Sequence, residues 1–202
     1  MSEISKNYTR IMMLVMTLLV VSVILLFWPV KSGNNNATKN MYSQTEWDFV
    51  LNSSEGPVSL SDYKGKVVVV YFGYAYCPDV CPTSLGLLSQ AFGKLKPDEL
   101  DAIQGLFISV DPERDTVENL KKYAAAFHPK IKGITGSEIE IADIAGRYGA
   151  SYMKVELTDS ALGYAVDHSS KYYLINRQGE LSKLLSHGTS PDNIVASLRS
   201  LL

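Results

Sequence analysis

The sequence predicts one α/β domain with a mixed β-sheet and flanking helices, preceded by a single transmembrane helix. Three observations support this prediction. The chain has 202 residues, enough for one domain of ordinary size with an appendage. Segments typical of strands and of helices alternate from Trp47 onward, as expected where helices pack on a sheet. Residues 11–28 form an apolar segment without a charged side chain, long enough for a membrane span.

Composition argues against several classes of protein. Hydrophobic residues make up 46% of the chain and charged residues 20%, so a packed core is expected rather than disorder. The formal net charge is −2 and the chain has no run of Lys or Arg, which argues against a nucleic-acid partner. Two cysteines are too few for a disulfide-stapled scaffold.

The apolar segment is IMMLVMTLLVVSVILLFW. As a helix it would extend about 27 Å, close to the thickness of the hydrocarbon core of a bilayer. Lys6 and Arg10 precede it, so the positive-inside rule places the N-terminus in the cytoplasm. The expected organisation is a cytoplasmic stretch over 1–10, a membrane anchor over 11–28, a polar linker over 29–45 and the domain over 46–202.

A cleaved signal peptide is the alternative for this segment. Signal peptides usually carry a shorter apolar region, of about 7–15 residues, and end in a small-residue cleavage site. The residues after the segment, FWPVKSGNNN, contain no such site, which favours an uncleaved anchor. Because no Arg- and Ser-rich transit peptide precedes it, we expect a single-pass protein of a bacterial inner membrane whose C-terminal domain faces the periplasm.

The strands and helices of the domain are predicted from the period of their apolar residues. The segment WDFVLN, residues 47–52, is a short strand. KVVVVYFGY, residues 66–74, is a continuous β-branched run that is typical of a central strand covered on both faces. Apolar residues at a helical spacing follow over 83–95, and LFISVD, residues 106–111, is a second buried strand.

The segment after the second buried strand is rich in charge. We predict that Asp111, Arg114 and Asp115 form a structural turn. Asp115 is also the predicted N-cap of a helix that ends at Phe127, with Glu118 as its capping-box partner.

Four further strands and two helices are expected in the rest of the domain. A short strand at 131–135 and a helix at 139–148 come first. The remaining strand-like segments are SYMKVEL, KYYLINRQG and ELSKLLS, residues 151–157, 171–179 and 180–186, with a turn at 177–179. Ser190 caps the last helix and Pro191 occupies its first position.

Both cysteines lie where the central strand ends and a helix begins, in YFGYAYCPDVCPTSL, residues 71–85. Sites in open α/β sheets gather at the carboxyl ends of strands. If 77–81 is helical, Cys77 and Cys81 share one face, with Cβ atoms about 5–6 Å apart. That span is wide for a disulfide, whose Cβ atoms are about 3.5–4.5 Å apart, and suits two thiolates on one metal ion. The helix N-terminus favours thiolates in either case.

Taken alone, the cysteine pair fits three interpretations. A structural disulfide would close a loop too short to restrain the unfolded chain much. A redox pair of the thioredoxin type normally has two residues between its cysteines, and here there are three. A metal site needs a third ligand. Two thiolates with one imidazole would suit Cu(I), whereas structural zinc prefers four protein ligands.

Three histidines are candidates for that ligand. His128 precedes a proline at a helix end and His187 lies in the loop SHGTS, so both are interpreted as structural. His168 lies just before a buried strand, where a histidine is ordinarily a hydrogen-bonded loop residue. The residues alone therefore leave a copper site as one hypothesis among three.

Four stretches together resemble the Sco/SenC family. They are YFGYAYCPDVCPTSL, ISVDPERDT, FHPKIKGITGS and VDHSSKYYLINRQGE, in the order in which the family has them. The family comprises membrane-anchored, thioredoxin-like proteins that help to assemble the copper centre of cytochrome c oxidase. The resemblance covers the domain from Trp47 to Leu202. It implies a thioredoxin-like α/β fold with an insertion between Asp111 and Tyr152.

The resemblance also implies roles for single residues. Cys77 and Cys81 would bind copper through sulfur and His168 would be the third ligand, with Cu(I) as the ion and Cu(II) as an open alternative. The same cysteines would cycle between dithiol and disulfide. The implied partners are the copper-bearing subunit of cytochrome c oxidase, an upstream copper donor or thiol reductant, and the membrane through the N-terminal helix.

Residues beside these ligands receive other roles. In an extended strand Asp167 points away from the face of His168, so we expect it to stabilise a turn or support the site rather than bind the metal. Asp79, a hard oxygen donor between the cysteines, would shape the loop. Many family members have Thr-His before the first cysteine, where this chain has Ala75 and Tyr76. The implied ligands are unaffected, but docking of a partner could differ.

The leading hypothesis is a copper-binding assembly factor rather than a turnover enzyme. The alternative is a thiol–disulfide oxidoreductase or redox sensor that uses Cys77 and Cys81, for which His168 would be dispensable. A peroxidase, which would need an activated attacking thiolate, is the third hypothesis.

Overall fold

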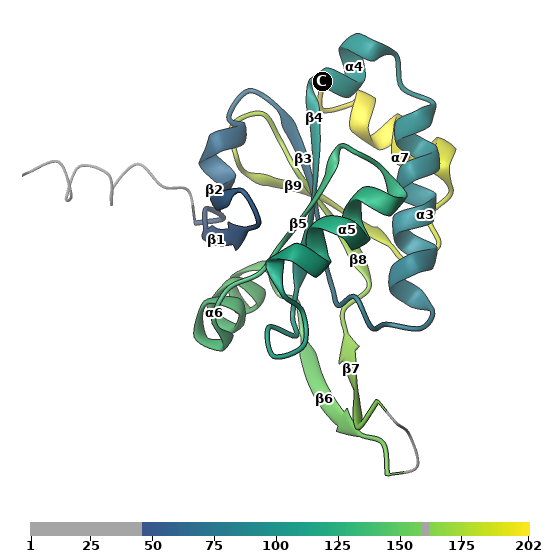
Figure 1. Ribbon diagram of the computed structural model, residues 1–202. Helices are drawn as coiled ribbons and strands as arrows, with labels where there is room; N and C mark the ends of the chain where they lie inside the picture. The colour runs from purple at the N-terminus through teal and green to yellow at the C-terminus, as the bar shows by residue number, and fades with distance from the viewer. Residues whose placement is uncertain (1–45, 159–161) are drawn as a thin grey trace, which may run out of the picture. The chain divides into compact units, whose positions relative to one another are not determined.

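The computed structural model describes residues 46–158 and 162–202, and its centre is a five-stranded mixed β-sheet (Figure 1). The strand order is β5 (Ile131–Ile134), β4 (Ile103–Ser109), β3 (Val67–Gly73), β8 (Lys171–Ile175) and β9 (Leu181–Ser186). Strand β4 is parallel to both β3 and β5, whereas β8 is antiparallel to both β3 and β9. The predicted α/β domain with a mixed sheet is therefore confirmed.

Helices and two small hairpins surround this sheet. The helices are α3 (Val80–Gly93), α4 (Pro97–Asp101), α5 (Val117–Phe127), α6 (Glu138–Tyr148), α7 (Pro191–Arg199) and the 3₁₀ helix η1 (Leu60–Tyr63). The hairpins are β1 (Val50–Ser53) with β2 (Gly56–Ser59), and β6 (Tyr152–Glu156) with β7 (Tyr164–His168). The predicted membrane anchor at 11–28 lies outside the described residues. Within the described part of the chain, no helix has the length and apolar character needed to span a bilayer.

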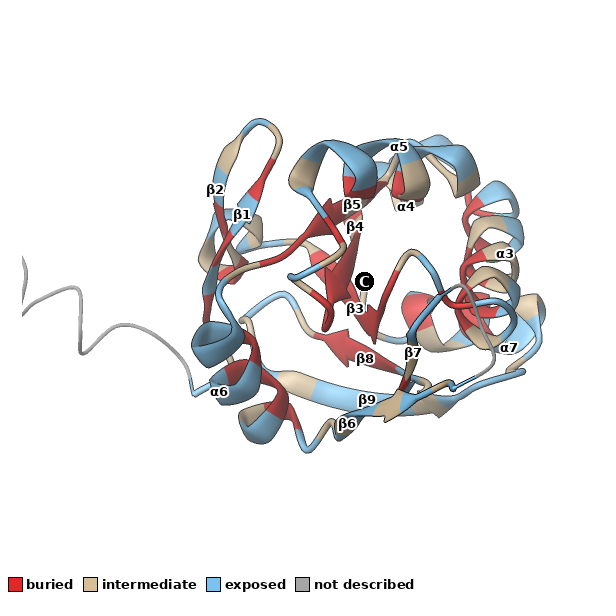
Figure 2. Cartoon of the chain, turned by 60° about the horizontal axis from the view of Figure 1, so that its bottom comes forward, coloured by how far each residue is buried: buried red, intermediate tan, exposed pale blue. Residues whose placement is uncertain are grey.

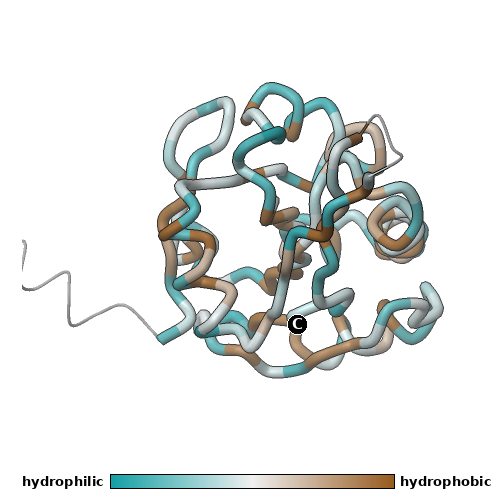
Figure 3. The backbone as a smooth tube through the Cα atoms, turned by 90° about the horizontal axis from the view of Figure 1, so that it is seen from below, coloured by the Kyte–Doolittle hydropathy of each residue, from teal (hydrophilic) through white to brown (hydrophobic). Residues whose placement is uncertain are grey.

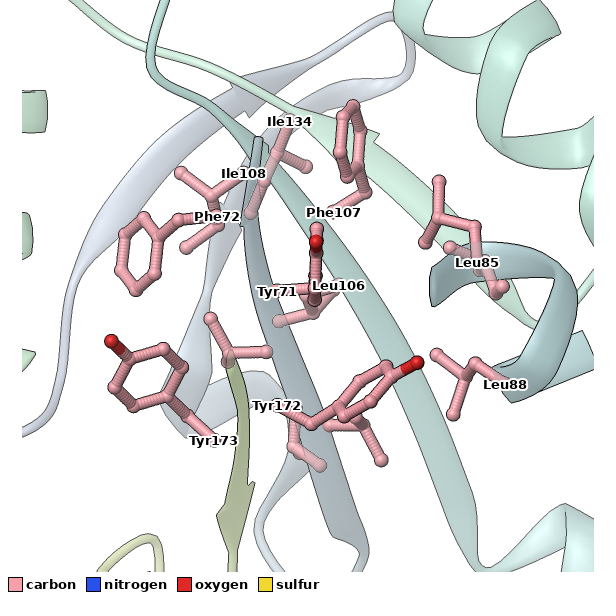
Figure 4. Packing of buried hydrophobic residues seen from close by; sticks show 14 of the residues in the cluster. Tyr71, Phe72, Leu85, Leu88, Leu106, Phe107, Ile108, Ile134, Tyr172 and Tyr173 are labelled. Atoms are coloured by element: carbon pink, nitrogen blue, oxygen red, sulfur yellow. The ribbon is translucent and has the colours of Figure 1, made fainter. Parts of the chain in front are cut away.

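Side chains of β3 alternate between the two faces of the sheet (Figure 4). Tyr71 points toward α3, where its hydroxyl donates to Ser84 Oγ over 3.1 Å. Phe72 points to the opposite face and contacts Tyr148 of α6. All seven residues of β3 are buried (Figure 2), which confirms the predicted central strand covered on both faces. Seen from below, hydrophobic and hydrophilic segments alternate along the backbone (Figure 3).

The carboxyl ends of β3 and β4 meet at one edge of the sheet. Gly73 pairs with Ser109 in the parallel register, and the Val110 N–H donates to the Gly73 carbonyl over 2.8 Å. The loops that follow these strands, 74–79 and 110–116, therefore leave the sheet side by side.

The β6–β7 hairpin extends from this edge and is not hydrogen-bonded into the main sheet (Figure 1). The strand predicted at 151–157 is confirmed as β6. Strand β7 was not predicted, and its last residue, His168, was expected in a loop. It pairs instead with Tyr152. The sequence hid β7 because only Val166 of its five residues is buried, and because the strand pairs with β6, away from the buried sheet.

The other predicted elements are present with shifted ends. The helix expected over 83–95 begins earlier, at Val80, and the final helix has Ser190 as N-cap and Pro191 in its first turn, as predicted. The strand expected at 47–52 begins at Val50. The elements β2, η1 and α4 were not predicted, since segments of four or five residues are too short to show a period.

The predicted N-cap of α5 is wrong. Thr116, not Asp115, caps the helix, and its side chain accepts from the Asn119 N–H. Asp115 is buried and turns inward, where its Oδ2 accepts from the Ser109 hydroxyl and the Ala75 N–H. Its carboxylate is therefore committed to the loops of the sheet edge and is not available to α5. Glu118 is exposed in the first turn and makes no capping box.

Two substitutions test whether α5 is capped by Thr116 or by Asp115 with Glu118. Thr116→Ala should lower the free energy of unfolding by about 1 kcal/mol, the usual loss for a capping hydroxyl. Glu118→Ala should cost less, because it removes only an exposed acidic group of the first turn. Chemical denaturation of both variants tests this, and an equal loss from Glu118→Ala would restore the capping box.

Candidate metal centre

Two cysteines and one histidine converge at the sheet edge. Their possible ligand atoms, Cys77 Sγ, Cys81 Sγ and a ring nitrogen of His168, lie within 4.8 Å of one another. Cys81 Sγ is 3.2 Å from His168 Nε2. The structure thus brings together three side chains that are up to 91 positions apart in the sequence (168 minus 77).

The cysteines do not share a helix face as the spacing suggested. Only Cys81 is in α3, which begins at Val80, while Cys77 lies in the loop before it. The sulfur of Cys77 instead accepts from the Cys81 N–H over 3.5 Å. Cys77 therefore occupies the positive end of the helix, where one of the unpaired N–H groups of the first turn is directed at it.

The two thiols have opposite acidities. Both are free and buried, Cys77 with 8% and Cys81 with 0% of its surface exposed. A hydrogen bond from Cys81, assisted by His168 and by the Asp79 and Cys81 N–H groups, lowers the pKa of Cys77 well below its ordinary value. Donating that bond, together with burial and the charge on Cys77, raises the pKa of Cys81. One thiolate beside one thiol is therefore the expected metal-free state.

This asymmetry predicts how stability depends on pH. A lowered pKa in the folded state stabilises the fold fully above the unfolded thiol's pKa, about 8.5, and less as pH falls toward the folded value. In the reduced, metal-free protein, the difference in unfolding free energy between wild type and Cys77→Ser should therefore grow between about pH 5 and about pH 8.5. Above that range the raised pKa of Cys81 acts in the opposite direction. Denaturation at several pH values measures this, and a difference independent of pH would contradict it.

The imidazole of His168 is oriented by its surroundings. Nδ1 lies 3.2 Å from the Ser169 carbonyl, which can only accept, so Nδ1 carries a proton and Nε2 is the ring nitrogen that faces the sulfurs. The edges of Tyr71 and Tyr74 frame the ring, with centroids 6.3 and 5.9 Å away. Asp167 is exposed and lies outside the ligand group, consistent with the expected alternation along the strand.

Gly73 allows Cys81 to approach the central strand. A Cβ at this position would lie 2.6 Å from Cys81 Sγ and 2.8 Å from a ring carbon of Phe107. Both distances are too short for real contacts, so no side chain fits without moving one of these groups. The sequence did signal this: a glycine within a buried strand indicates a close approach.

Gly73→Ala should therefore displace the sulfur of Cys81. We expect metal affinity to fall about 10- to 100-fold, as for other losses of support to a ligand, together with destabilisation of about 1–3 kcal/mol from overpacking. Gly86→Ala is the matched control, because it lies in α3 with nothing within 4 Å of its added Cβ. It should keep full affinity and gain about 0.5–1 kcal/mol.

The remaining candidate residues lie apart from the ligands. His187 Nδ1 bonds Ser84 Oγ over 2.9 Å, and His128 packs against the Phe92 ring. Neither joins the ligand group, in agreement with their structural interpretation. Asp79 is the N-cap of α3, and its Oδ1 accepts from Thr83. Tyr76 is 45% exposed at the rim.

The donor set determines which metals fit. Two sulfurs and one imidazole nitrogen are soft to intermediate donors, which suit Cu(I), and no carboxylate joins them within the described residues. Structural zinc normally takes four protein ligands, one more than this group contains. Burial of Cys77 and Cys81 also limits the access of water and oxidants to their sulfurs.

Comparison with known proteins establishes the family. The profile of the SCO1/SenC family matches residues 37–202. This chain belongs to the SCO1/SenC family. The SCO2-like protein RC0895 of Rickettsia conorii is 38% identical over 154 residues, which cover 76% of this chain and 75% of the relative.

Solved structures of family members share the fold. ScoI of Bradyrhizobium japonicum, with copper bound, is 35% identical, with a TM-score of 0.69 over 77% of this chain and 98% of ScoI. BsSco, described as having a disulfide switch and as a member of the Sco family of cytochrome c oxidase assembly proteins, is 27% identical. Its TM-score is 0.59, over 76% of this chain and 91% of BsSco. The thioredoxin-like α/β fold that the sequence resemblance implied is therefore confirmed.

Proposed function

We propose that this SCO1/SenC protein binds copper through Cys77, Cys81 and His168 and serves in the assembly of the copper centre of cytochrome c oxidase. The observation that carries this proposal is the convergence of two sulfurs and one imidazole nitrogen within 4.8 Å. Such a donor set favours Cu(I) over harder ions. Cu(II) is the second ion to be tested, because imidazole also suits it.

The similar proteins support both parts of the proposal. Copper is bound in ScoI of Bradyrhizobium japonicum, and BsSco is described among cytochrome c oxidase assembly proteins. We extend copper binding and this assembly role to the present chain. Copper is the cargo here, received from an upstream donor and passed to the copper-bearing subunit of the oxidase. A three-ligand site suits transfer, since an incoming ligand can add before a protein ligand leaves.

The proposed setting is a membrane. Residues 11–28 would anchor the chain, 1–10 would remain in the cytoplasm, and 29–45 would link the anchor to the copper-binding domain at 46–202. The uncharged apolar segment and the positive charges before it support this arrangement. The domain would then face the periplasm.

Copper titration tests the ligand set. The full-length protein, reduced and kept free of oxygen, should bind one Cu(I) in competition with a chromophoric chelator. Cys77→Ala, Cys81→Ala and His168→Ala should each weaken binding by more than the 10- to 100-fold typical of a lost supporting contact. His128→Ala, which removes an imidazole away from the site, should bind normally. Normal affinity in His168→Ala would refute the three-ligand site.

Thiol–disulfide exchange is a second candidate function. The observation that favours it is a low-pKa thiol, Cys77, within 4.8 Å of a second thiol. The Cys77 thiolate would attack a partner's disulfide, and Cys81 would then release the partner as a dithiol and leave a disulfide here. Two electrons pass to the partner, with one proton from the Cys81 thiol and one from solvent, because Cys77 starts as the thiolate. Full reductase activity in His168→Ala with copper chelated would favour this function over copper delivery.

A further inference from the structure

The element that carries His168 is held to the domain by side chains rather than by the main sheet. Strand β7 pairs with β6, and the described residues show no ladder between this hairpin and the five-stranded sheet. The chain enters β6 after Ala150 and leaves β7 through Ser169 and Ser170. A two-stranded hairpin is marginally stable by itself. Contacts with the rest of the domain therefore set the direction of the imidazole.

Arg114 makes several of these contacts from the loop 110–116. Its Nη1 donates to the carbonyls of Leu162 and Tyr164, over 3.2 and 2.9 Å. Its Cζ lies 3.6 Å from the centroid of the Tyr164 ring, so the guanidinium covers the ring face. Its Nε donates over 2.5 Å to Asp111, whose side chain is fully buried. The guanidinium thus contacts Asp111 of the loop 110–116 on one side and the β6–β7 hairpin on the other.

Tyr164 and His168 lie on the same face of β7. Side chains at even spacing share one face of a strand, so Tyr164, Val166 and His168 all point inward. Tyr164 meets Arg114, Val166 is buried, and His168 meets Cys81. Tyr164 and His168 are about 13 Å apart along the strand. Fixing the Tyr164 end therefore fixes the roll of the strand about its axis, and with it the direction of the imidazole.

The same loop also holds the cysteine side of the site. Asp115, next to Arg114, accepts from the Ala75 N–H over 2.9 Å. Arg114 itself lies 5.6 Å from the Tyr74 ring and 5.3 Å from the Tyr76 ring, just before Cys77. One short loop thus contacts both the segment that bears the sulfurs and the hairpin that bears the imidazole.

From these contacts we infer that Arg114 is a positioning residue for His168. Together with the Tyr164 hydroxyl, which donates to Asp111 Oδ1 over 2.8 Å, Arg114 holds the hairpin against the loop 110–116 and so keeps the imidazole directed at the two sulfurs. The inference rests on the proposed function for its effect on copper, and it assigns Arg114 more than the structural turn that the sequence suggested. His168 lies three residues before β8, which belongs to the main sheet. Loss of the Arg114 contacts should therefore turn the imidazole ring rather than move it out of the site.

An ion pair between the hairpin and the loop 110–116 provides a control. Lys154 of β6 pairs with Glu113, but their side chains are 40% and 60% exposed, and surface pairs usually contribute little. Lys154→Gln should therefore leave copper affinity within about twofold of wild type. Its outcome separates a specific role of Arg114 from any loosening of the hairpin.

The test compares two arginines that make the same kinds of contact. Arg114→Lys keeps the charge and loses the planar group that covers Tyr164 and reaches two carbonyls. Arg147→Lys is the matched control. Arg147 also bonds a carboxylate, that of Asp143, and two backbone carbonyls, but it lies at α6. Tyr164→Leu keeps the Asp111–Arg114 ion pair but removes both the ring beneath Arg114 and the hydroxyl that donates to Asp111. It replaces Arg114→Lys if that variant fails to fold.

The expected result is a selective and non-additive loss in the full-length protein. Arg114→Lys and Tyr164→Leu should weaken Cu(I) binding about 10-fold, the low end for a lost supporting contact, while Arg147→Lys binds normally. In the His168→Ala background, Arg114→Lys should cause no further loss. A purely structural role would instead lower affinity by the same factor in both backgrounds, which would overturn the inference.

A second measurement needs no copper. In the metal-free protein, nuclear Overhauser contacts between His168 and Tyr74, whose ring centroids are 5.9 Å apart, should weaken in Arg114→Lys and persist in Arg147→Lys. Unchanged contacts in Arg114→Lys would overturn the inference. If the wild type binds no copper, the proposed function fails, whereas these ring contacts still decide whether Arg114 positions His168.

Discussion

The site depends on the pairing of β3 with a strand on each side. Its parallel register with β4 ends with Gly73 opposite Ser109, which brings the cysteine loop and the loop 110–116 to one edge. Its antiparallel register with β8 places Tyr71 opposite Tyr172, so β8 begins where β3 ends. His168, three residues before β8, therefore arrives at the same edge. Strand β3 is buried on both faces, which makes a shift of either register costly.

The contacts at this edge of the sheet stabilise an anionic sulfur on Cys77. The first turn of α3 directs an N–H at Cys77, and Cys81 donates to the same sulfur. Cys81 is enclosed against Gly73, where no side chain would fit. These contacts favour the thiolate form of Cys77, whereas burial and the charge on Cys77 favour the protonated form of Cys81. Copper binding and disulfide formation draw on the same two atoms, so each excludes the other.

The loop 110–116 joins the two halves of the site. Asp115 is buried beneath the cysteine segment, and burial raises the pKa of its carboxyl group. Arg114 beside it faces the hairpin of His168. Neighbouring side chains in an irregular loop point in different directions, and this loop uses that freedom to contact two elements. A polar turn that would otherwise be a solvent-exposed connection thus becomes part of the support of the site.

From the sequence we could predict the α/β class, the buried central strand and the place of Cys77 and Cys81 at its carboxyl end. These follow from local patterns, namely period, β-branching and the strand-to-helix transition. The sequence did not determine the cap of α5, since Asp115 and Thr116 are both good caps and only the distant Ala75 N–H decides between them.

Only the packed fold shows which histidine lies beside the sulfurs. Residues 77 and 168 are brought together by the order of strands in the sheet, which local sequence does not encode, so from the residues alone His168 was no better a candidate than an ordinary loop histidine. The resemblance of the chain to the SCO1/SenC family pointed to His168, and the structure shows why: its ring lies beside the two sulfurs. The closeness of Cys81 to Gly73 and the hold of Arg114 on the hairpin also required tertiary structure, because both are contacts between segments that only the packed fold makes neighbours.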